Sequence, residues 1–441
     1  MQTIGFFFFI GQLFIFYISS SSLASTTRRL TSPKLTDLQL EDFNLKVNPN
    51  LNFENPRLMK AYCALQEWKK AMYSDPQNMT GNWVGTDVCS YEGVFCAHAL
   101  DDPNIVTVAL IDLNYGDIAG YLVPHLALLS DLGVFHINSN RFFGIIPKTF
   151  SKLNLLFEFD ISNNRFVGPF PKIVLSMPHL RFLDLRYNEF EGKLPPELFD
   201  KRLDAIVLNN NRFHSNIPDN IGNSRVSMLV LANNKFTGCI PKSFVNMPRL
   251  EQVSLSNNQL TGCIPEDIVN LQGLIVLDMS DNEFVGSLPK NLHTLKRVER
   301  FDFSNNELTG EINKSVCSMP SLLDFRISSN YFNEISEECD KLMSEQLISV
   351  KDYDNCFFKR PHQKPTKICS PMVNSKVDCK NVPCTLQKSD VEPGNRKITP
   401  HKPKPPLPKA ALIPPKTKTP GAIRPQFLLM IVEVEIRYGV S

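Results

Sequence analysis

The middle of the chain repeats one pattern of apolar and polar positions, which the stretch from Leu180 to Pro195 shows clearly. Leucine-type residues stand at fixed places, an Asn follows, a large apolar residue comes two positions later, and Gly and Leu-Pro or Ile-Pro complete the unit. An earlier copy, Leu110 to Gly120, has Gly116 in the Asn position, so the chain holds ten recognisable copies. In the others the Asn recurs at steps of 23 or 24 residues, at Asn140, Asn164, Asn188, Asn211, Asn234, Asn258, Asn282, Asn306 and Asn330.

One copy cannot bury its apolar face by itself. Leu180, Leu183 and Leu185 must all point inward, and the equivalent trio is apolar in every copy. Neighbouring copies therefore have to stack as the coils of a solenoid with one continuous core. The recurrent Asn should point inward too and bond backbone groups at the bend, because a buried unpaired amide costs roughly 1 to 3 kcal/mol.

The period and the spelling L-x-x-L-x-L-x-x-N resemble the leucine-rich repeat, and the Gly-x-Ile-Pro ending resembles its extracellular plant subclass. This resemblance implies an α/β solenoid, a leucine-rich repeat horseshoe of about ten repeats with Cys-containing caps at both ends. We expect the repeats to occupy residues 105–335.

Three segments are expected before the repeats. Residues 1–24 hold an apolar run and end in small residues, which predicts a secretory signal peptide although no Lys or Arg precedes the run. An uncleaved anchor is the weaker alternative, because the run is shorter than the roughly 20 residues of a membrane span. A polar segment, residues 25–56, then leads to an N-terminal cap, residues 57–104.

The N-terminal cap should begin with a helix at Asn55-Pro56, with the Asn as its cap. Its apolar stripe can cover the open end of the repeat core and consists of Leu58, Tyr62, Leu65, Trp68 and Met72. Cys89 and Cys96 resemble the paired cysteines of the caps of extracellular plant repeat proteins. Zinc binding is the alternative, and it is disfavoured because no His or second Cys pair stands nearby.

All eleven cysteines follow the proposed cleavage site, which suits an oxidising compartment. Cys239 and Cys263 hold the same position in adjacent repeats, where coils should stack at about 4.8 Å. A disulfide between them is geometrically allowed, and two free thiols are the alternative. Because eleven is odd, one cysteine lacks an intramolecular partner. Our candidate is Cys63, either as the intermolecular bridge of a homodimer or as a buried thiol.

Beyond Ser315 the repeat decays and six cysteines accumulate. The stretch from Asn355 to Cys369, with Cys379 and Cys384, resembles the Cys-rich hinge of plant leucine-rich repeat extensins, and the resemblance covers residues 57–384. Residues 336–384 are therefore expected to form a Cys-rich C-terminal cap or hinge. The six cysteines allow fifteen pairings, which the sequence leaves open, and they are Cys317, Cys339, Cys356, Cys369, Cys379 and Cys384.

Residues 385–441 depart from the extensin pattern, because they contain no runs of Ser followed by several Pro. Between residues 385 and 426 nine Lys or Arg face two acids, and Pro is frequent, so a basic disordered tail is expected. This tail could hold acidic wall polysaccharide, or it could be a solvated linker. The apolar stretch at residues 427–436 is too short and too acidic for a membrane anchor.

Side chains between the inward leucines should line a concave face that leans acidic. Such a face favours a basic peptide or protein, although Leu-Asp-Leu is also simply how this repeat subclass is spelled. The candidate ligand-binding residues are Asp112, His136, Glu158, Asp160, Asp184, Arg186, Asp278, Asp302 and Asp324.

The sequence gives no sign of catalysis, of a cofactor or of a metal site. It contains no kinase phosphate loop, no Gly-x-Ser-x-Gly elbow and no His-Glu-x-x-His motif. The net charge of +2 gives no indication of nucleic-acid binding. Asn78 and Asn313 stand in glycosylation sequons, which act only in a secreted chain.

Resemblance to the extensin-like family implies a secreted, wall-associated protein that binds small basic Cys-containing peptides, the rapid alkalinisation factors. It would then act in wall integrity and cell growth. Two alternatives stay open: an inhibitor of microbial pectin-degrading enzymes, like the polygalacturonase-inhibiting proteins, and a structural wall component.

Overall fold

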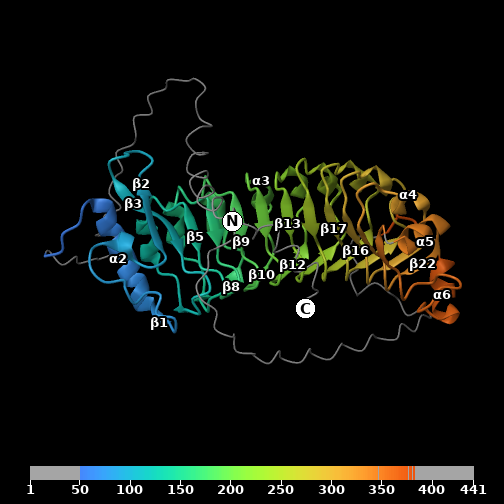
Figure 1. The fold of residues 1–441 in the computed structure, drawn as a ribbon, viewed down its shortest axis with the longest axis horizontal. Helices are drawn as coiled ribbons and strands as arrows, with labels where there is room; N and C mark the ends of the chain where they lie inside the picture. The colour runs from blue at the N-terminus through green and yellow to red at the C-terminus, as the bar shows by residue number, and fades with distance from the viewer. Residues whose placement is uncertain (1–49, 346, 376, 380, 383–441) are drawn as a thin grey trace, which may run out of the picture. The chain divides into compact units, whose positions relative to one another are not determined.

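The coils of the repeat stack in chain order in the computed structural model, from the blue N-terminal part to the orange C-terminal part of Figure 1. The structure describes residues 50–345, 347–375, 377–379 and 381–382. The expected signal peptide at residues 1–24, almost all of the polar segment 25–56 and the tail 385–441 lie outside these residues. Within them, no helix is long and apolar enough to cross a membrane.

Each repeat contributes one short strand to a sheet that runs the length of the described repeats, in the order β2-β3-β5-β7-β9-β11-β13-β15-β17-β19-β21-β23. β2 and β3 are antiparallel, and all later neighbours are parallel. The strands are β2 (Val94–His98), β3 (Val106–Asp112), β5 (Val134–His136), β7 (Glu158–Asp160), β9 (Phe182–Asp184), β11 (Ala205–Val207), β13 (Met228–Val230), β15 (Gln252–Ser254), β17 (Val276–Asp278), β19 (Arg300–Asp302), β21 (Asp324–Arg326) and β23 (Ser349–Lys351).

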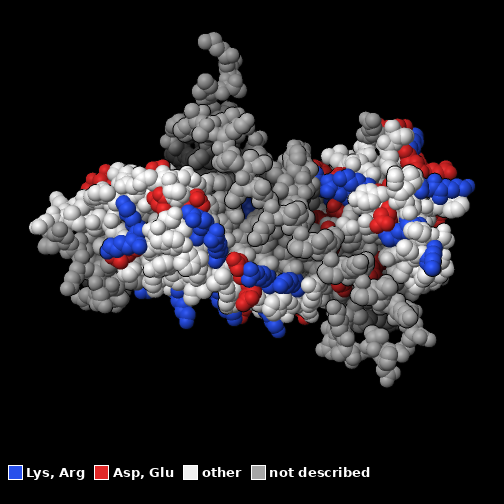
Figure 2. Space-filling model, turned by 90° about the horizontal axis from the view of Figure 1, so that it is seen from below, with Lys and Arg blue, Asp and Glu red and all other residues white. Residues whose placement is uncertain are grey.

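A second parallel sheet follows the Asn of each coil, and its face seen from below carries charges of both signs (Figure 2). Its strands are β6 (Phe143–Gly144), β8 (Arg165–Pro169), β10 (Glu189–Gly192), β12 (Arg212–Asn216), β14 (Lys235–Gly238), β16 (Gln259–Cys263), β18 (Glu283–Gly286), β20 (Glu307–Ile312) and β22 (Tyr331–Ile335). A small antiparallel sheet joins β1 (Met72–Ser74) to β4 (Ala119–Gly120) near the N-terminal cap.

Helical turns complete the coils and caps. The α-helices are α2 (Pro56–Ala71), α3 (Glu197–Asp200), α4 (Lys314–Cys317), α5 (Glu337–Ser344) and α6 (Thr366–Val373). The 3₁₀ turns are η2 (Val88–Ser90), η3 (Pro124–Leu128), η4 (Lys148–Lys152), η5 (Lys172–Ser176), η6 (Ile221–Asn223), η7 (Lys242–Asn246), η8 (Glu266–Asn270) and η9 (Leu292–Thr294).

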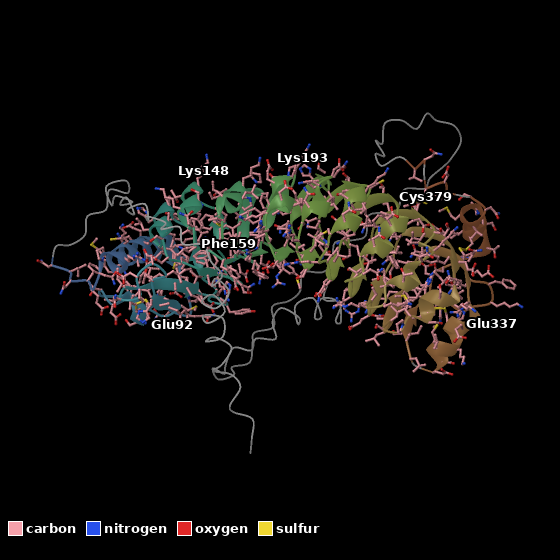
Figure 3. All side chains as sticks on the ribbon, turned by 90° about the horizontal axis from the view of Figure 1, so that it is seen from above. Glu92, Lys148, Phe159, Lys193, Glu337 and Cys379 are labelled. Carbon is pink, nitrogen blue, oxygen red and sulfur yellow. A yellow bond between two sulfur atoms is a disulfide. The ribbon has the colours of Figure 1, made fainter. Side chains whose placement is uncertain are left out.

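The core runs through the stacked coils, as the inward Phe159 in Figure 3 shows. The recurrent Asn side chains join the coils. The amide group of Asn188 donates to the carbonyls of Ile161 (3.0 Å) and Leu185 (3.2 Å), and its oxygen accepts from the N–H of Phe166 at 3.0 Å. The same three kinds of bond recur in the coils from Asn140 to Asn330. This confirms the expectation that the Asn satisfies backbone groups at the bend.

The coil pattern continues past residue 335, where the sequence analysis ended the repeats. Asn355 lies 25 residues after Asn330 and donates to the carbonyl of Ile327 at 2.8 Å, as the other ladder residues do. β23 is the strand of this additional coil. The longer spacing, with α5 inserted between the two Asn residues, hid the coil in a stretch rich in cysteines.

The N-terminal cap closes the first coil as predicted. The Asn55 side chain accepts from the N–H groups of Arg57 and Leu58, at 2.9 and 3.0 Å. Trp68 of α2 is fully buried, and its ring stacks on Phe142 at 5.6 Å between centroids. Leu58 and Leu65 of the predicted stripe are buried, whereas Tyr62 and Met72 are partly buried against the core. The open end of the solenoid is thereby covered by apolar side chains.

The cysteines near the N-terminus behave differently from one another. Cys89 and Cys96 form a disulfide with a Cα separation of 5.5 Å. Cys63 is a free thiol on α2, only 6% exposed, and burial raises its pKa. A sulfur so placed cannot reach a second chain without movement of the helix. The structure therefore favours the buried thiol over the intermolecular bridge.

The predicted link between adjacent repeats is wrong. Cys263 pairs with Cys379, which is 116 residues further along the chain, and Cys239 is disulfide-bonded elsewhere. The six C-terminal cysteines consequently do not pair only among themselves. Cys317 pairs with Cys339 and Cys356 with Cys369, while Cys384 lies outside the described residues.

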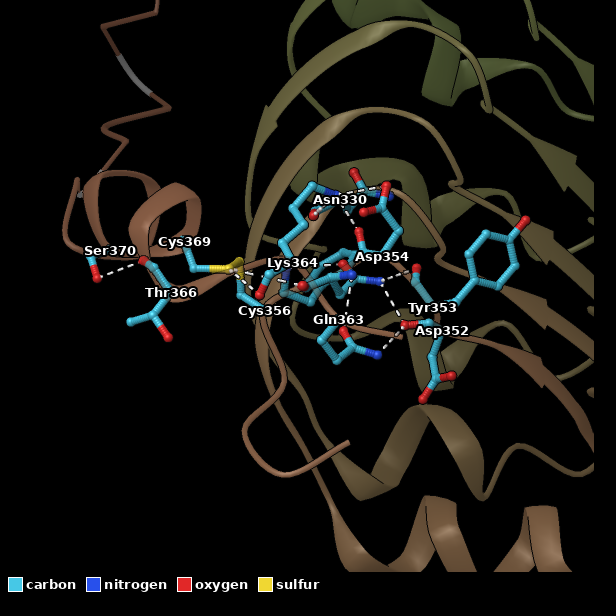
Figure 4. The surroundings of a disulfide bond; sticks show 12 residues. Asn330, Asp352, Tyr353, Asp354, Cys356, Gln363, Lys364, Thr366, Cys369 and Ser370 are labelled. Atoms are coloured by element: carbon cyan, nitrogen blue, oxygen red, sulfur yellow. Dashed lines mark hydrogen bonds and ion pairs between the residues drawn. A yellow bond between two sulfur atoms is a disulfide. The ribbon is translucent and has the colours of Figure 1, made fainter. Parts of the chain in front are cut away.

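The C-terminal cap is fastened around the Cys356–Cys369 disulfide (Figure 4). Lys364 donates to the carbonyl of Asn330 at 2.8 Å and lies 3.2 Å from the carboxylate of Asp354. The buried side of this cap lies against the last coils, because α6 packs on β20 and β22. The disulfide and the lysine thus hold the segment over the end of the core.

One coil lacks the glycine that its bend requires. The other described coils place Gly at this point with positive φ, as at Gly192 (φ 85°), but Ser215 stands there with φ 83°. A residue with a Cβ is strained in this region, by about 1 to 2 kcal/mol. We expect Ser215→Gly to raise the free energy of unfolding by about 1 kcal/mol, measured by urea denaturation.

Gly192→Ser is the matched control for that exchange. A Cβ at Gly192 would meet nothing within 4 Å, so the change tests the backbone conformation alone. It should destabilise the chain by a similar amount. Equal stability of all three proteins would show that φ at this bend is not strained.

Candidate ligand-binding face

The side chains that the long sheet turns away from the core form what we call the strand face. Its register places one residue of each coil beside the equivalent residue of the next, as in the pairs Asp112 with His136 and His136 with Asp160. The column continues through Asp184, Val207, Val230, Ser254, Asp278, Asp302 and Arg326. The predicted alignment of candidate residues is therefore present in the fold.

The N-terminal part of the strand face gathers negative charge around one histidine. The imidazole Nε2 of His136 lies 3.1 Å from a carboxylate oxygen of Glu158. Burial alone would lower the pKa of His136, but Glu158, Asp160 and Asp112 outweigh it and raise the pKa above its ordinary value. All four side chains are half-buried, so they stay within reach of a ligand. We call them the acidic segment.

Asp184 and Arg186 neutralise one another at the next coil. Arg186 Nε lies 3.1 Å from one carboxylate oxygen of Asp184, and the Arg186 N–H donates to the other at 3.0 Å. Asp184 is only 2% exposed, so it was expected to look outward but offers little surface. Apolar residues follow on β11 and β13, where Ala205, Val207 and Val230 are buried.

The C-terminal part of the strand face is an ionic cluster of both signs. Arg326 reaches Asp324 at 2.8 Å and Asp302 at 3.6 Å, and Arg300 reaches Asp324 at 3.4 Å. Burial, together with the negative charge of Asp278, raises the pKa of Asp302 to about 7. Sequence reasoning named the acids but did not find this pairing, because strand register alone brings the arginines beside them.

Other predicted sites lie away from the strand face. Asn78 is exposed in a turn, and Asn313 is half-buried at the start of α4, where its side chain accepts from the N–H of Ser315 at 3.0 Å. Both remain predictions as glycosylation sites. In the described part of the chain, no three His, Cys, Asp or Glu side chains gather in a way that could hold a metal ion.

Comparison with known families matches the two parts of the described chain. Residues 130–190, 201–260 and 224–284 match the leucine rich repeat family, and residues 62–97 match the leucine rich repeat N-terminal domain. These matches agree with the coils and with the cap formed by α2.

Two relatives from Arabidopsis thaliana illustrate the similarity among curated proteins. The chain is 58% identical over 405 residues to pollen-specific leucine-rich repeat extensin-like protein 3, covering 90% of this chain and 55% of that protein. It is 67% identical over 167 residues to leucine-rich repeat extensin-like protein 4, covering 38% and 34% respectively. The chain thus spans about half, or less, of the length of these relatives.

Solved structures share the fold. The ectodomain of the Arabidopsis receptor kinase HAESA, in complex with an extended IDA peptide hormone, is 25% identical with a TM-score of 0.56. That similarity covers 69% of this chain and 54% of the other. A plant ice-binding protein is 22% identical with a TM-score of 0.58, covering 69% and 97%, and shows the fold alone.

Proposed function

Because this chain belongs to the leucine-rich repeat extensin-like family, we propose that it binds a small, basic, Cys-containing signalling peptide of the alkalinisation-factor type at the cell wall. The observation that carries this proposal is the acidic segment: Asp112, Glu158 and Asp160 gather around His136 on an ordered sheet. Facing carboxylates favour a cationic ligand and speed its encounter.

Two further features support a peptide ligand. The HAESA ectodomain, which has the same fold, is described in complex with a peptide hormone. The disulfides of this chain suit an oxidising, extracellular compartment, so we place the protein outside the cell and in the wall. Binding, with no catalysis, is then its role in wall integrity and growth.

The test is calorimetric titration of the full-length chain with a panel of basic Cys-containing alkalinisation peptides at two salt concentrations. We expect binding that weakens with salt, because exposed charges are screened beyond about 10 Å at 0.1 M ionic strength. The double variant Glu158→Gln/Asp160→Asn should weaken binding about tenfold or more, because charge-assisted contacts contribute about 1.5 to 3 kcal/mol each.

Glu197→Gln/Asp267→Asn is the matched control, since it removes two exposed acids that lie outside the strand face. It should leave the affinity unchanged. Equal losses in both double variants would contradict the acidic segment as the binding site. If no peptide binds and the chain inhibits a fungal polygalacturonase instead, the alternative of an inhibitor of pectin-degrading enzymes replaces this proposal.

A further inference from the structure

A second charged surface lies away from the strand face, at the entry of the coils into β9, β11, β13 and β15. Four arginines line a groove there of about 230 Å³, together with Leu203 and Asp204. The arginines are Arg181, Arg202, Arg225 and Arg249. We call this surface the arginine groove. It comes from four consecutive coils, so three steps of about 4.8 Å give it a length of about 14 Å.

The repeat itself builds this groove. Arg202, Arg225 and Arg249 each stand directly before an inward apolar residue, at the same point of three successive coils. The coils stack in register, so their cationic groups are presented at the spacing of the strands. Arg181 joins them from the preceding coil, because its Nη1 donates to the carbonyl of Arg202 at 2.8 Å.

These arginines lack the partners that other arginines of the chain have. Among the described residues, no ion pair joins any of the four to a carboxylate, whereas Arg297 lies 3.4 Å from Glu251 and Arg212 lies 2.7 Å from Glu189. Arg202, Arg225 and Arg249 are exposed. Asp204 is the one acid that lines the groove, so its lining carries a net charge of +3 from four arginines and one aspartate.

The chemistry of the groove indicates what it can hold. Guanidinium groups bind carboxylate, sulfate and phosphate through paired hydrogen bonds. The lining has no exposed aromatic or apolar side chain, since Leu203 is buried, whereas protein interfaces usually bury an apolar centre. A narrow, cationic and hydrophilic groove of this length therefore fits an extended, hydrophilic polyanion better than the surface of a folded protein.

We infer that the arginine groove is a binding site for a linear polyuronate, a polysaccharide with one carboxylate on each sugar. This assignment is independent of the proposed peptide binding, because it uses another surface and a ligand of opposite charge. It also differs from the expectation for the basic tail, which lies outside the described residues.

The test is titration of the full-length chain with a fully de-esterified oligogalacturonate. Arg202→Gln/Arg225→Gln/Arg249→Gln should weaken binding by about tenfold or more, since lost charge-assisted hydrogen bonds dominate. Lys148→Gln/Lys172→Gln/Lys193→Gln removes the same charge from exposed residues elsewhere, two of which Figure 3 labels, and should change binding by less than about threefold.

A variant of opposite sign adds a readout that a folding defect would not produce. Asp204→Asn removes the negative charge from the groove and should strengthen oligogalacturonate binding a few-fold. Equal losses in the arginine and lysine triple variants would overturn the site. Equal binding of methyl-esterified oligogalacturonate would overturn the role of the carboxylates. Tighter binding of a sulfated polysaccharide, of inorganic phosphate or of an acidic peptide by the same arginines would overturn the polyuronate assignment.

Discussion

Replacing Asn188 by Ala is expected to lower the free energy of unfolding by about 3 kcal/mol or more, the largest effect of any single polar exchange that we expect here. Its side chain is buried and serves two coils at once. Without it, the N–H of Phe166 loses its acceptor and the carbonyl of Arg186 loses a donor at 3.2 Å. Each buried group left unpaired costs about 1 to 3 kcal/mol. Urea denaturation of the full-length chain measures the loss.

Two further variants separate the roles of the Asn188 side chain. Asn154→Ala is the control, because Asn154 is exposed and no hydrogen bond of its side chain is recorded in the structure. It should change stability by less than about 0.5 kcal/mol. Asn188→Asp keeps an acceptor for the Phe166 N–H but loses the donors, so its cost should be intermediate at neutral pH. Equal stability of Asn188→Ala and Asn154→Ala would show that the ladder bonds do not support the fold.

The Asn ladder could be predicted from sequence because its role is the same in every coil. A residue that recurs at 23 or 24 positions with inward neighbours must occupy one point of a repeating backbone, and only a few backbone groups are within its reach. The additional coil at Asn355 was missed for the same reason, since its spacing of 25 residues broke the pattern that identified the others.

Cysteine pairing could not be predicted in the same way. Equivalent positions in neighbouring coils suggested a bond between Cys239 and Cys263, and coil spacing allows one. The structure instead brings Cys379 from the C-terminal region back to Cys263, with a Cα separation of 5.7 Å. Where that region lies on the coils depends on packing that no local spacing encodes.

The candidate site was predicted as a column of residues but not as surfaces with different properties. Asp160 and Asp184 hold equivalent positions in neighbouring strands, yet Asp160 is half-buried while Asp184 is almost fully buried beside Arg186. The arginine groove had no signature at all, because single arginines in separate repeats look like ordinary surface residues. Their importance arises only when the coils are stacked.

The buried carboxyl of Asp302 should make the stability of the solenoid depend on pH in a direction opposite to that of an ordinary ion-paired acid. Burial and the charge of Asp278 raise its pKa from 3.8 to about 7, although Arg326 and the N–H of Ser304 favour the charged form. The folded chain therefore keeps this proton between about pH 4 and pH 7, where the unfolded chain has lost it. Stability must then fall as pH rises through that interval and level off above it.

Asp302→Asn removes this titration while keeping an oxygen for the Ser304 N–H, which now donates to Asp302 at 2.9 Å. Relative to the parent chain, the variant should gain about 3 to 4 kcal/mol between the two ends of the interval, because one pKa unit corresponds to about 1.4 kcal/mol. Asp160→Asn is the matched control: the N–H of Ser162 bonds Asp160 at the same 2.9 Å, so it measures the cost of exchanging Asp for Asn at this point of a coil. Urea denaturation across the interval decides the matter. Parallel curves for the parent and Asp302→Asn would mean that Asp302 is ionised throughout, held by Arg326 at the C-terminal end of the strand face.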